Sequence, residues 1–148
     1  REAFLKALKE VIEKLQSTIK PDLVERIGLR YINRIMFNSR DRLATLLQPG
    51  VLGIVDDEVD EYLASSFTET RFLLPDGLKV NGKWGLLPGN QSYDPTVLPP
   101  IETQSWILDI DGFTETNTDF DAENILESLN RLADVNYRLF RFTVKGSL

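Results

Sequence analysis

Three evenly spaced arginines are the side chains in this sequence with the clearest capacity for binding chemistry. Arg26, Arg30 and Arg34 follow one another at intervals of four residues, so on an extended strand all three project from the same face. A guanidinium group carries its N–H donors in a rigid fork that suits phosphates and carboxylates. These three arginines are therefore our candidate residues for binding an anion or a partner.

Internal pairing is the alternative for this arginine row. Asp109 and Asp111 also alternate on one face of a predicted strand. If the two strands are neighbours, the carboxylates pair across to the arginines, and each such cross-strand pair contributes roughly 0.2 to 1 kcal/mol. We favour this interpretation, because charged residues on the central strands of a sheet are seldom left without partners.

The same two aspartates offer a second chemistry when Asp119 and Asp121 join them. Hard cations such as Mg²⁺ and Mn²⁺ prefer oxygen ligands, so this group would suit a metal-dependent hydrolase or nuclease. The glycine-rich phosphate loop that often accompanies phosphate chemistry is absent from the sequence. We keep hydrolysis at Asp109 and Asp111 as an alternative and assign no catalytic residue, metal ligand or cofactor.

A dense acidic segment also raises the question of a metal. An EF-hand loop requires a central glycine and oxygen ligands at fixed alternate positions, and that order is missing here. We therefore expect a solvated acidic turn or short helix. The segment contains Asp56, Asp57, Glu58, Asp60 and Glu61.

Two aromatic residues, Trp84 and Tyr93, lie near predicted loops and would be able to stack on a ring or a base. Few basic residues surround them in the sequence, Lys79 and Lys83 only. We therefore expect Trp84 to be a buried or half-buried hydrophobic residue.

The composition removes several classes of enzyme and partner. The 148 residues include no Cys and no His, which excludes disulfides, thiol nucleophiles, Cys/His zinc sites and imidazole catalysis. The formal net charge of −6 repels nucleic acid unless one face is locally basic, so we expect no nucleic-acid partner. The apolar runs are too short to cross a bilayer, so we expect no membrane partner either.

The strand that must position the arginines is predicted from Leu23 to Phe37, because apolar residues alternate with them there. A second strand is predicted from Gln104 to Phe113, and we expect the polar residues 114–119 to end it. Residues 63–74 form another predicted strand. The turn signal at residues 75–77 follows it, and Asn81-Gly82 predicts a second turn before residues 83–87.

Helices are predicted on either side of these strands. An amphipathic helix runs from Phe4 to about Lys20, and a short helix begins at Asn38 or Ser39, continues through Leu47 and stops at Pro49 and Gly50. Asp121 can cap a long final helix. The proline-rich residues 88–100 form a predicted loop. This order predicts an α+β fold: one domain over residues 1–148, with an antiparallel or mixed sheet of about four strands and helices packed mainly on one face.

Two short runs carry a resemblance to a known family. The runs Arg26-Ile27-Gly28-Leu29-Arg30-Tyr31-Ile32-Asn33-Arg34 and Ile107-Leu108-Asp109-Ile110-Asp111, followed by an amphipathic helix leading to Phe140, resemble the C-terminal portion of a sporadically distributed family of uncharacterised prokaryotic proteins. The resemblance implies that this chain is the C-terminal part of a longer protein, which its start inside a predicted helix also suggests. It implies no catalytic assignment.

We therefore predict a cytoplasmic, non-catalytic binding or interaction module. Its sheet would present a surface to a protein partner, to the N-terminal segment of the longer protein, or to an anionic ligand. Because a sheet edge can pair with another strand, a homo-oligomer is a further alternative. Anion or nucleic-acid binding by the face of Arg26, Arg30 and Arg34 is the remaining alternative.

Overall fold

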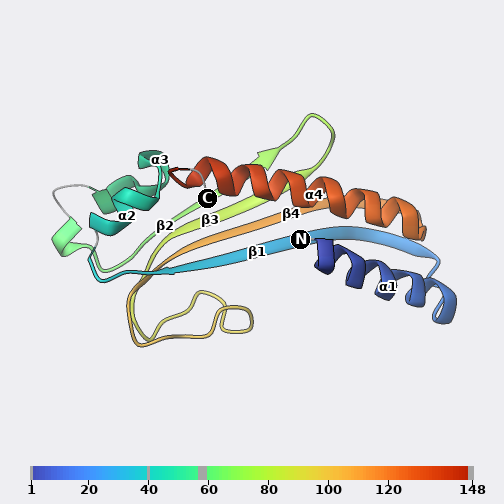
Figure 1. Ribbon diagram of the computed structural model, residues 1–148, viewed down its shortest axis with the longest axis horizontal. Helices are drawn as coiled ribbons and strands as arrows, with labels where there is room; N and C mark the ends of the chain where they lie inside the picture. Colours follow the sequence, from blue (N-terminus) through green and yellow to red (C-terminus); the bar gives the residue numbers. More distant parts are fainter. Residues whose placement is uncertain (1, 40, 57–59, 147–148) are drawn as a thin grey trace.

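A computed structural model of the chain describes residues 2–39, 41–56 and 60–146. Four strands form one antiparallel sheet in the order β1-β4-β3-β2. The long helix α4 (Ala122–Thr143) runs along one side of this sheet, and the loop between β3 and β4 lies on the other side (Figure 1). The predicted α+β class is confirmed. The strands are β1 (Leu23–Met36), β2 (Ser66–Leu73), β3 (Lys79–Leu87) and β4 (Ser105–Asp119).

The remaining helices lie on the same face of the sheet as α4. The buried side chains of α1, α2, α3 and η1 join two apolar clusters with the residues that β1, β3 and β4 project to that face. This arrangement confirms the prediction that helices gather mainly on one face. These helices are α1 (Glu2–Thr18), α2 (Asp41–Leu46), α3 (Pro49–Leu52) and the short 3₁₀ helix η1 (Gly53–Asp56); a second 3₁₀ helix, η2 (Asp60–Tyr62), ends in the exposed Tyr62.

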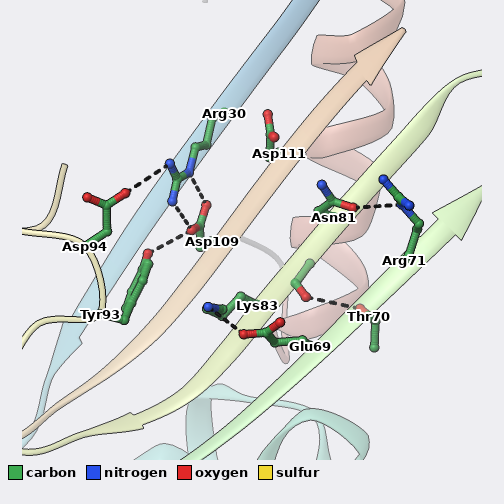
Figure 2. A pocket seen from close by; sticks show the side chains of 11 residues that line it. Arg30, Glu69, Thr70, Arg71, Asn81, Lys83, Tyr93, Asp94, Asp109 and Asp111 are labelled. Carbon is green, nitrogen blue, oxygen red and sulfur yellow. Dashed lines mark hydrogen bonds and ion pairs between the residues drawn. The ribbon is translucent and has the colours of Figure 1, made fainter. Parts of the chain in front are cut away.

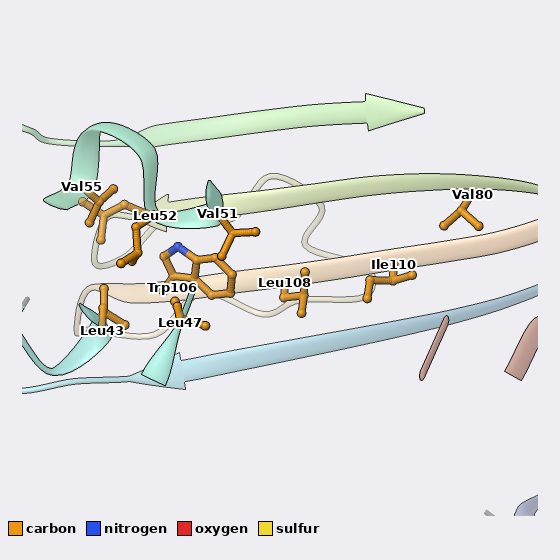
Figure 3. Close-up of a cluster of buried hydrophobic side chains, with 10 residues drawn as sticks. Leu43, Leu47, Val51, Leu52, Val55, Val80, Trp106, Leu108 and Ile110 are labelled. Atoms are coloured by element: carbon orange, nitrogen blue, oxygen red, sulfur yellow. The ribbon is translucent and has the colours of Figure 1, made fainter. Parts of the chain in front are cut away.

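The core is organised along β4. Trp106, Leu108 and Ile110 alternate along this strand, and each is at most 2% exposed. Figure 3 shows side chains from α2, α3 and η1, together with Leu47, which follows α2, gathered around the Trp106 ring. Since β4 is paired on both sides and covered by helices, it is the most firmly positioned strand of the sheet.

Helix α4 approaches β4 closely at one glycine. Asn136 of α4 is fully buried, and its Nδ2 donates to the carbonyl oxygen of Leu29 on β1 at 2.8 Å. A Cβ atom at Gly112 would lie 2.4 Å from Asn136 Oδ1, well inside contact distance. Gly112 therefore allows the buried amide to sit directly on the sheet.

The predicted turn at Asn81-Gly82 is wrong. Both residues lie in the middle of β3, where Gly82 pairs with Thr70 of β2 on one side and with Ile110 of β4 on the other. The chain reverses instead at residues 75–77, where Gly77 adopts φ 84°. Pairing on both sides of β3 outweighs the local preference of an Asn-Gly pair for a turn.

Two predicted boundaries also differ from the structure. The polar residues 114–119 continue β4 instead of ending it, because the first residues of β1 pair with residues 114–115 and 118–119 on either side of a shift in register. Pro49 begins α3, where a proline at the first helical turn loses no hydrogen bond, whereas the prediction had it only stop the preceding helix. Residues 57–59 of the acidic segment lie outside the described residues, and the backbone on either side of them forms η1 and η2.

Candidate functional site

The face of the sheet opposite the helices, which we call the open face, carries most of the charged strand residues. Antiparallel pairing places side chains of all four strands in rows across this face. Two adjacent rows are almost entirely polar. The first row is Arg30, Asp111, Asn81 and Arg71, and the second is Ile32, Asp109, Lys83 and Glu69, each in the order β1, β4, β3, β2.

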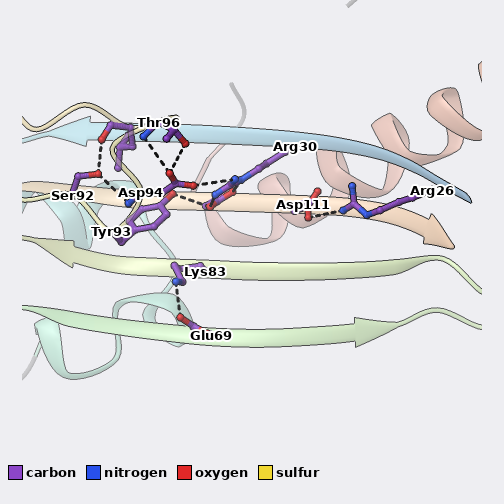
Figure 4. A network of polar contacts seen from close by, with 11 residues as sticks. Arg26, Arg30, Glu69, Lys83, Ser92, Tyr93, Asp94, Thr96 and Asp111 are labelled. Carbon is purple, nitrogen blue, oxygen red and sulfur yellow. Dashed lines mark hydrogen bonds and ion pairs between the residues drawn. The ribbon is translucent and has the colours of Figure 1, made fainter.

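Two ion pairs join β1 to β4 on the open face, and we call this group of four side chains the β1–β4 clasp. Arg30 binds Asp109 through two bonds, Nε to Oδ1 at 2.8 Å and Nη2 to Oδ2 at 2.6 Å. Arg26 Nη2 lies 3.0 Å from Asp111 Oδ2. Both pairs run diagonally between rows, as Figure 2 shows for Arg30 and Asp109 and Figure 4 for Arg26 and Asp111. The internal pairing that we favoured from the sequence is therefore present.

The loop between β3 and β4 adds to the clasp from above the sheet. The Tyr93 hydroxyl donates to Asp109 Oδ2 at 2.8 Å, and Asp94 Oδ2 lies 3.7 Å from Arg30 Nη1. Leu98 of this loop is buried against Leu87 and Ile107, which holds the loop on the sheet. The Asp109 side chain is only 7% exposed, so its charge depends on these partners.

These contacts shift the proton affinities of the groups involved. The bonds to Asp109 raise the pKa of Arg30 above its usual range, which keeps the guanidinium charged. Burial, together with the bond to Asp109, raises the pKa of Tyr93 well above the usual value of a phenol. A hydrogen bond from Thr96 lowers the pKa of Asp94. At neutral pH, Arg30 of the clasp is therefore charged, and the Tyr93 hydroxyl that contacts the clasp keeps its proton.

A pocket of about 680 Å³ opens beside the clasp over β3 and β2 (Figure 2). On its floor, Lys83 Nζ lies 2.6 Å from Glu69 Oε1 and 5.0 Å from the centre of the Tyr93 ring. Arg71 Nε donates to Asn81 Oδ1 at 3.3 Å, so Arg71 is bound here to a neutral group. The lining residues from the strands and the loop are Arg30, Glu69, Thr70, Arg71, Asn81, Gly82, Lys83, Tyr93, Asp94, Asp109 and Asp111.

Arg34 does not join the other two candidate arginines. It is paired in register with Ile107, so this row of β4 offers it no carboxylate. Its side chain lines a separate cavity of about 470 Å³, and its Nε and Nη2 atoms are buried without a hydrogen-bond partner among the described residues. The structure therefore brings together Arg26 and Arg30 with the aspartates but leaves Arg34 outside the group.

The four aspartates considered for a metal site are not brought together. Both Asp109 oxygens are bound by Arg30 and Tyr93, whereas Asp121 accepts from the backbone N–H of Asn124 at 2.8 Å and caps α4 as predicted. Asp119 pairs with Leu23 at the far end of β4. In the described ranges of the chain, no three acidic side chains lie where they would hold a metal ion.

Several pocket residues were not identified from the sequence. The Asn-Gly pair predicts a turn at Asn81, whereas in the structure Asn81, Lys83 and their β2 partners share one face. The sequence suggests only ring stacking for Tyr93, whereas its hydroxyl is the atom that contacts the clasp. Trp84 lies on the helix face and is half-buried against the core, as expected for a packing residue.

Comparisons with known proteins add no relative. The chain matches no family model, and no curated protein or solved structure matches it. The prokaryotic family suggested by the two short runs therefore stays a prediction. None of the helices in the described part of the chain is long and apolar enough to span a bilayer.

Proposed function

We propose that this chain is a non-catalytic interaction module that binds a protein partner on its open face. The observation that carries this proposal is the β1–β4 clasp. Because Asp109 and Asp111 already neutralise Arg30 and Arg26, the open face does not offer a free row of cations. It offers alternating charges and hydrogen-bonding groups, a pattern that a polypeptide with charges of both signs can match.

The charges around the pocket favour a protein over a simple anion. Three cationic and four anionic side chains line it, so its field is not positive. To bind Arg30 directly, an anion would have to displace Asp109 and leave that nearly buried carboxylate with the tyrosine alone. Leaving a buried charge without its partner costs several kcal/mol, on the order of 3 to 5. Anion or nucleic-acid binding through Arg26 and Arg30 is thus disfavoured.

The outer part of the pocket can contact a partner without opening the clasp. Arg71 is exposed and donates to the side-chain amide of Asn81, and Glu69 is 71% exposed at its side chain. The rings of Phe67 and Tyr93 meet edge to face at 5.9 Å beside these groups. Exposed arginine and aromatic side chains around a pocket are typical of protein interfaces.

The proposed partner is either a separate protein or another segment of the longer polypeptide that the family resemblance implies. In both cases the partner binds the open face, and we propose that the module itself catalyses no reaction. We propose a cytoplasmic location, which fits the cysteine-free composition without requiring it.

Site-specific photocrosslinking in cells that make the protein tests the proposal. A photoreactive phenylalanine analogue is introduced at Asn81, which is exposed on the open face, and separately at Glu127, which is exposed on α4. We expect a discrete protein adduct from position 81 and not from position 127. Equal adducts from both positions, or none from position 81, would contradict the proposal.

A further inference from the structure

Strand β2 forms an edge of the sheet with no neighbour on its outer side. It pairs with β3 alone, and within the described part of the chain no strand lies beyond it (Figure 4). None of its eight side chains is buried; Phe67 and Phe72 are each 37% exposed, and Leu73 is 72% exposed. An edge strand presents unpaired N–H and C=O groups along its length, and these groups can pair with another strand.

We propose that β2 pairs antiparallel with β2 of a second copy of this chain, and that the two sheets join into one sheet of eight strands. The pairing is centred on Thr70, which lies opposite Thr70 of the second copy. Glu69 then lies opposite the second copy's Arg71, and Phe67 opposite its Leu73. Because a two-fold axis relates the copies, the Glu69–Arg71 and Phe67–Leu73 contacts are each made twice.

The charge pattern of β2 selects this register. A shift of one residue in the β2–β2 register would place the helices of the two copies on opposite faces of the joined sheet. Alternative registers that keep the helices on one face therefore differ from the proposed one by two residues. A shift of two in one direction places Glu69 opposite Glu69, and a shift of two in the other places Arg71 opposite Arg71. Like charges directly opposite one another are destabilising, whereas opposite charges and apolar pairs contribute roughly 0.2 to 1 kcal/mol each.

The side chains needed for these pairs are accessible. Arg71 is exposed and bound to a neutral amide, and the Glu69 side chain can contact a second cation while it remains near Lys83. Glu69 and Arg71 also line the pocket, so pairing would place the pockets of two copies side by side on one continuous face. The β2 pairing does not require that the open face bind a further protein.

Disulfide trapping tests the register directly, because the chain contains no cysteine of its own. Thr70→Cys would bring two thiols together at a Cα separation of roughly 4.5 to 5.5 Å, within the range of a disulfide. Thr68→Cys is the matched control. In the proposed register, position 68 of one copy lies opposite Phe72 of the second copy, so the two introduced cysteines are four residues apart along the strands, about 13 Å. Under mild oxidation we expect a covalent dimer from Thr70→Cys and little from Thr68→Cys. Equal yields from the two variants would overturn the proposed register.

A charge exchange tests the same pairing without cysteine. We expect sedimentation equilibrium of the unmodified chain to show a monomer–dimer equilibrium. Arg71→Glu should weaken the dimer about tenfold, because two cross-strand pairs then become repulsive. The double variant Glu69→Arg with Arg71→Glu should restore dimerisation, since each position again faces its opposite charge. A chain that is monomeric at all concentrations, or a double variant no better than Arg71→Glu, would overturn the proposal.

Discussion

At the scale of single residues, the carboxylate of Asp109 is the group on which the open face depends. It is nearly buried, it receives two bonds from Arg30 and one from Tyr93, and it lies on the central strand β4. A buried charge with three donors is well compensated, but each donor then becomes necessary. The energetic role of Arg30 therefore lies in holding Asp109 more than in presenting a free cation.

Replacing Arg30 by alanine should lower the free energy of unfolding by roughly 3 kcal/mol, the lower end of the range for a buried charge that loses its partner, because Asp109 would keep the tyrosine as a side-chain partner. The matched control is Arg71→Ala, which removes an arginine bound to a neutral amide on the same face. We expect the control to change stability by less than about 0.5 kcal/mol. Urea unfolding of both variants measures the difference, and equal losses would show that Asp109 does not depend on Arg30.

Tyr93 should make stability depend on alkaline pH. Its pKa in the folded chain lies above the usual phenol value of about 10, so the folded state retains the phenolic proton to higher pH than the unfolded state does. The stabilising contribution is therefore complete below pH 10 and is lost progressively as the pH rises above it. In Tyr93→Phe, stability should fall less steeply above pH 10 than in the unchanged chain.

Stability measurements from pH 9 to 11, together with the absorbance of tyrosinate, test this prediction. Tyr137→Phe is the control, because Tyr137 is 55% exposed and lies on α4. In the absorbance titration, we expect Tyr93→Phe to lack the tyrosine that ionises at the highest pH, and Tyr137→Phe to retain it. A steep alkaline loss that persists in Tyr93→Phe would contradict the assigned bond to Asp109.

The pairing of arginines with aspartates could be predicted for two reasons. Side chains alternate between the two faces of a strand, and opposite charges on the same face of adjacent strands form ion pairs. The particular partners could not be predicted, since both pairs run diagonally and the register is set by the whole sheet. Arg34 follows the same alternation, yet Ile107 occupies the position opposite it. Tyr93 lies in a loop without periodicity, so nothing local indicated its contact with Asp109.

At the scale of elements, the packing of α4 on the sheet depends on Gly112 of β4 and Asn136 of α4. A side chain at Gly112 would collide with the buried amide, whose Nδ2 is bonded to the backbone of β1. Gly112→Ala should therefore destabilise the fold by about 2 kcal/mol. The clash should disappear in Asn136→Ala, so the cost of Gly112→Ala in that background should be smaller by at least about 1 kcal/mol.

A double-mutant cycle of these two positions, measured by urea unfolding, gives the coupling energy. Gly50→Ala is a control for the glycine substitution itself, because a Cβ at Gly50 meets nothing within 4 Å. We expect that variant to be neutral or slightly stabilising. Additive effects of Gly112→Ala and Asn136→Ala would mean that α4 does not approach β4 through this pair.

Elements with long apolar periodicity were predictable, and those decided by pairing were not. The arginine strand, the final helix and its Asp121 cap follow from local pattern and capping chemistry. The Asn-Gly pair in β3 has a strong local preference for a turn, but strands on both sides hold it extended. Residues 114–119 are polar and look like a loop, yet the first residues of β1 pair with them.

At the scale of the whole molecule, the two faces of one sheet serve different purposes. Helices and apolar side chains hold one face, and charges that are largely paired with one another cover the other. The formal net charge of −6 is thus compatible with an arginine-rich strand, because Arg26 and Arg30 of β1 are paired with Asp111 and Asp109 of the adjacent β4. The open face presents a mixed-charge surface suited to a protein partner.

The most direct test of this internal pairing follows the arginine Nε–Hε signals of the intact chain by ¹⁵N NMR during a titration with inorganic phosphate. We predict that Arg30 Hε exchanges slowly with water. We also predict that the signals of Arg30 and Arg26 show no saturable chemical-shift change with phosphate concentration, because Asp109 and Asp111 are already bonded to the two guanidinium groups. Fast exchange at Arg30, with saturable shifts of both signals, would contradict the account and identify a free anion site.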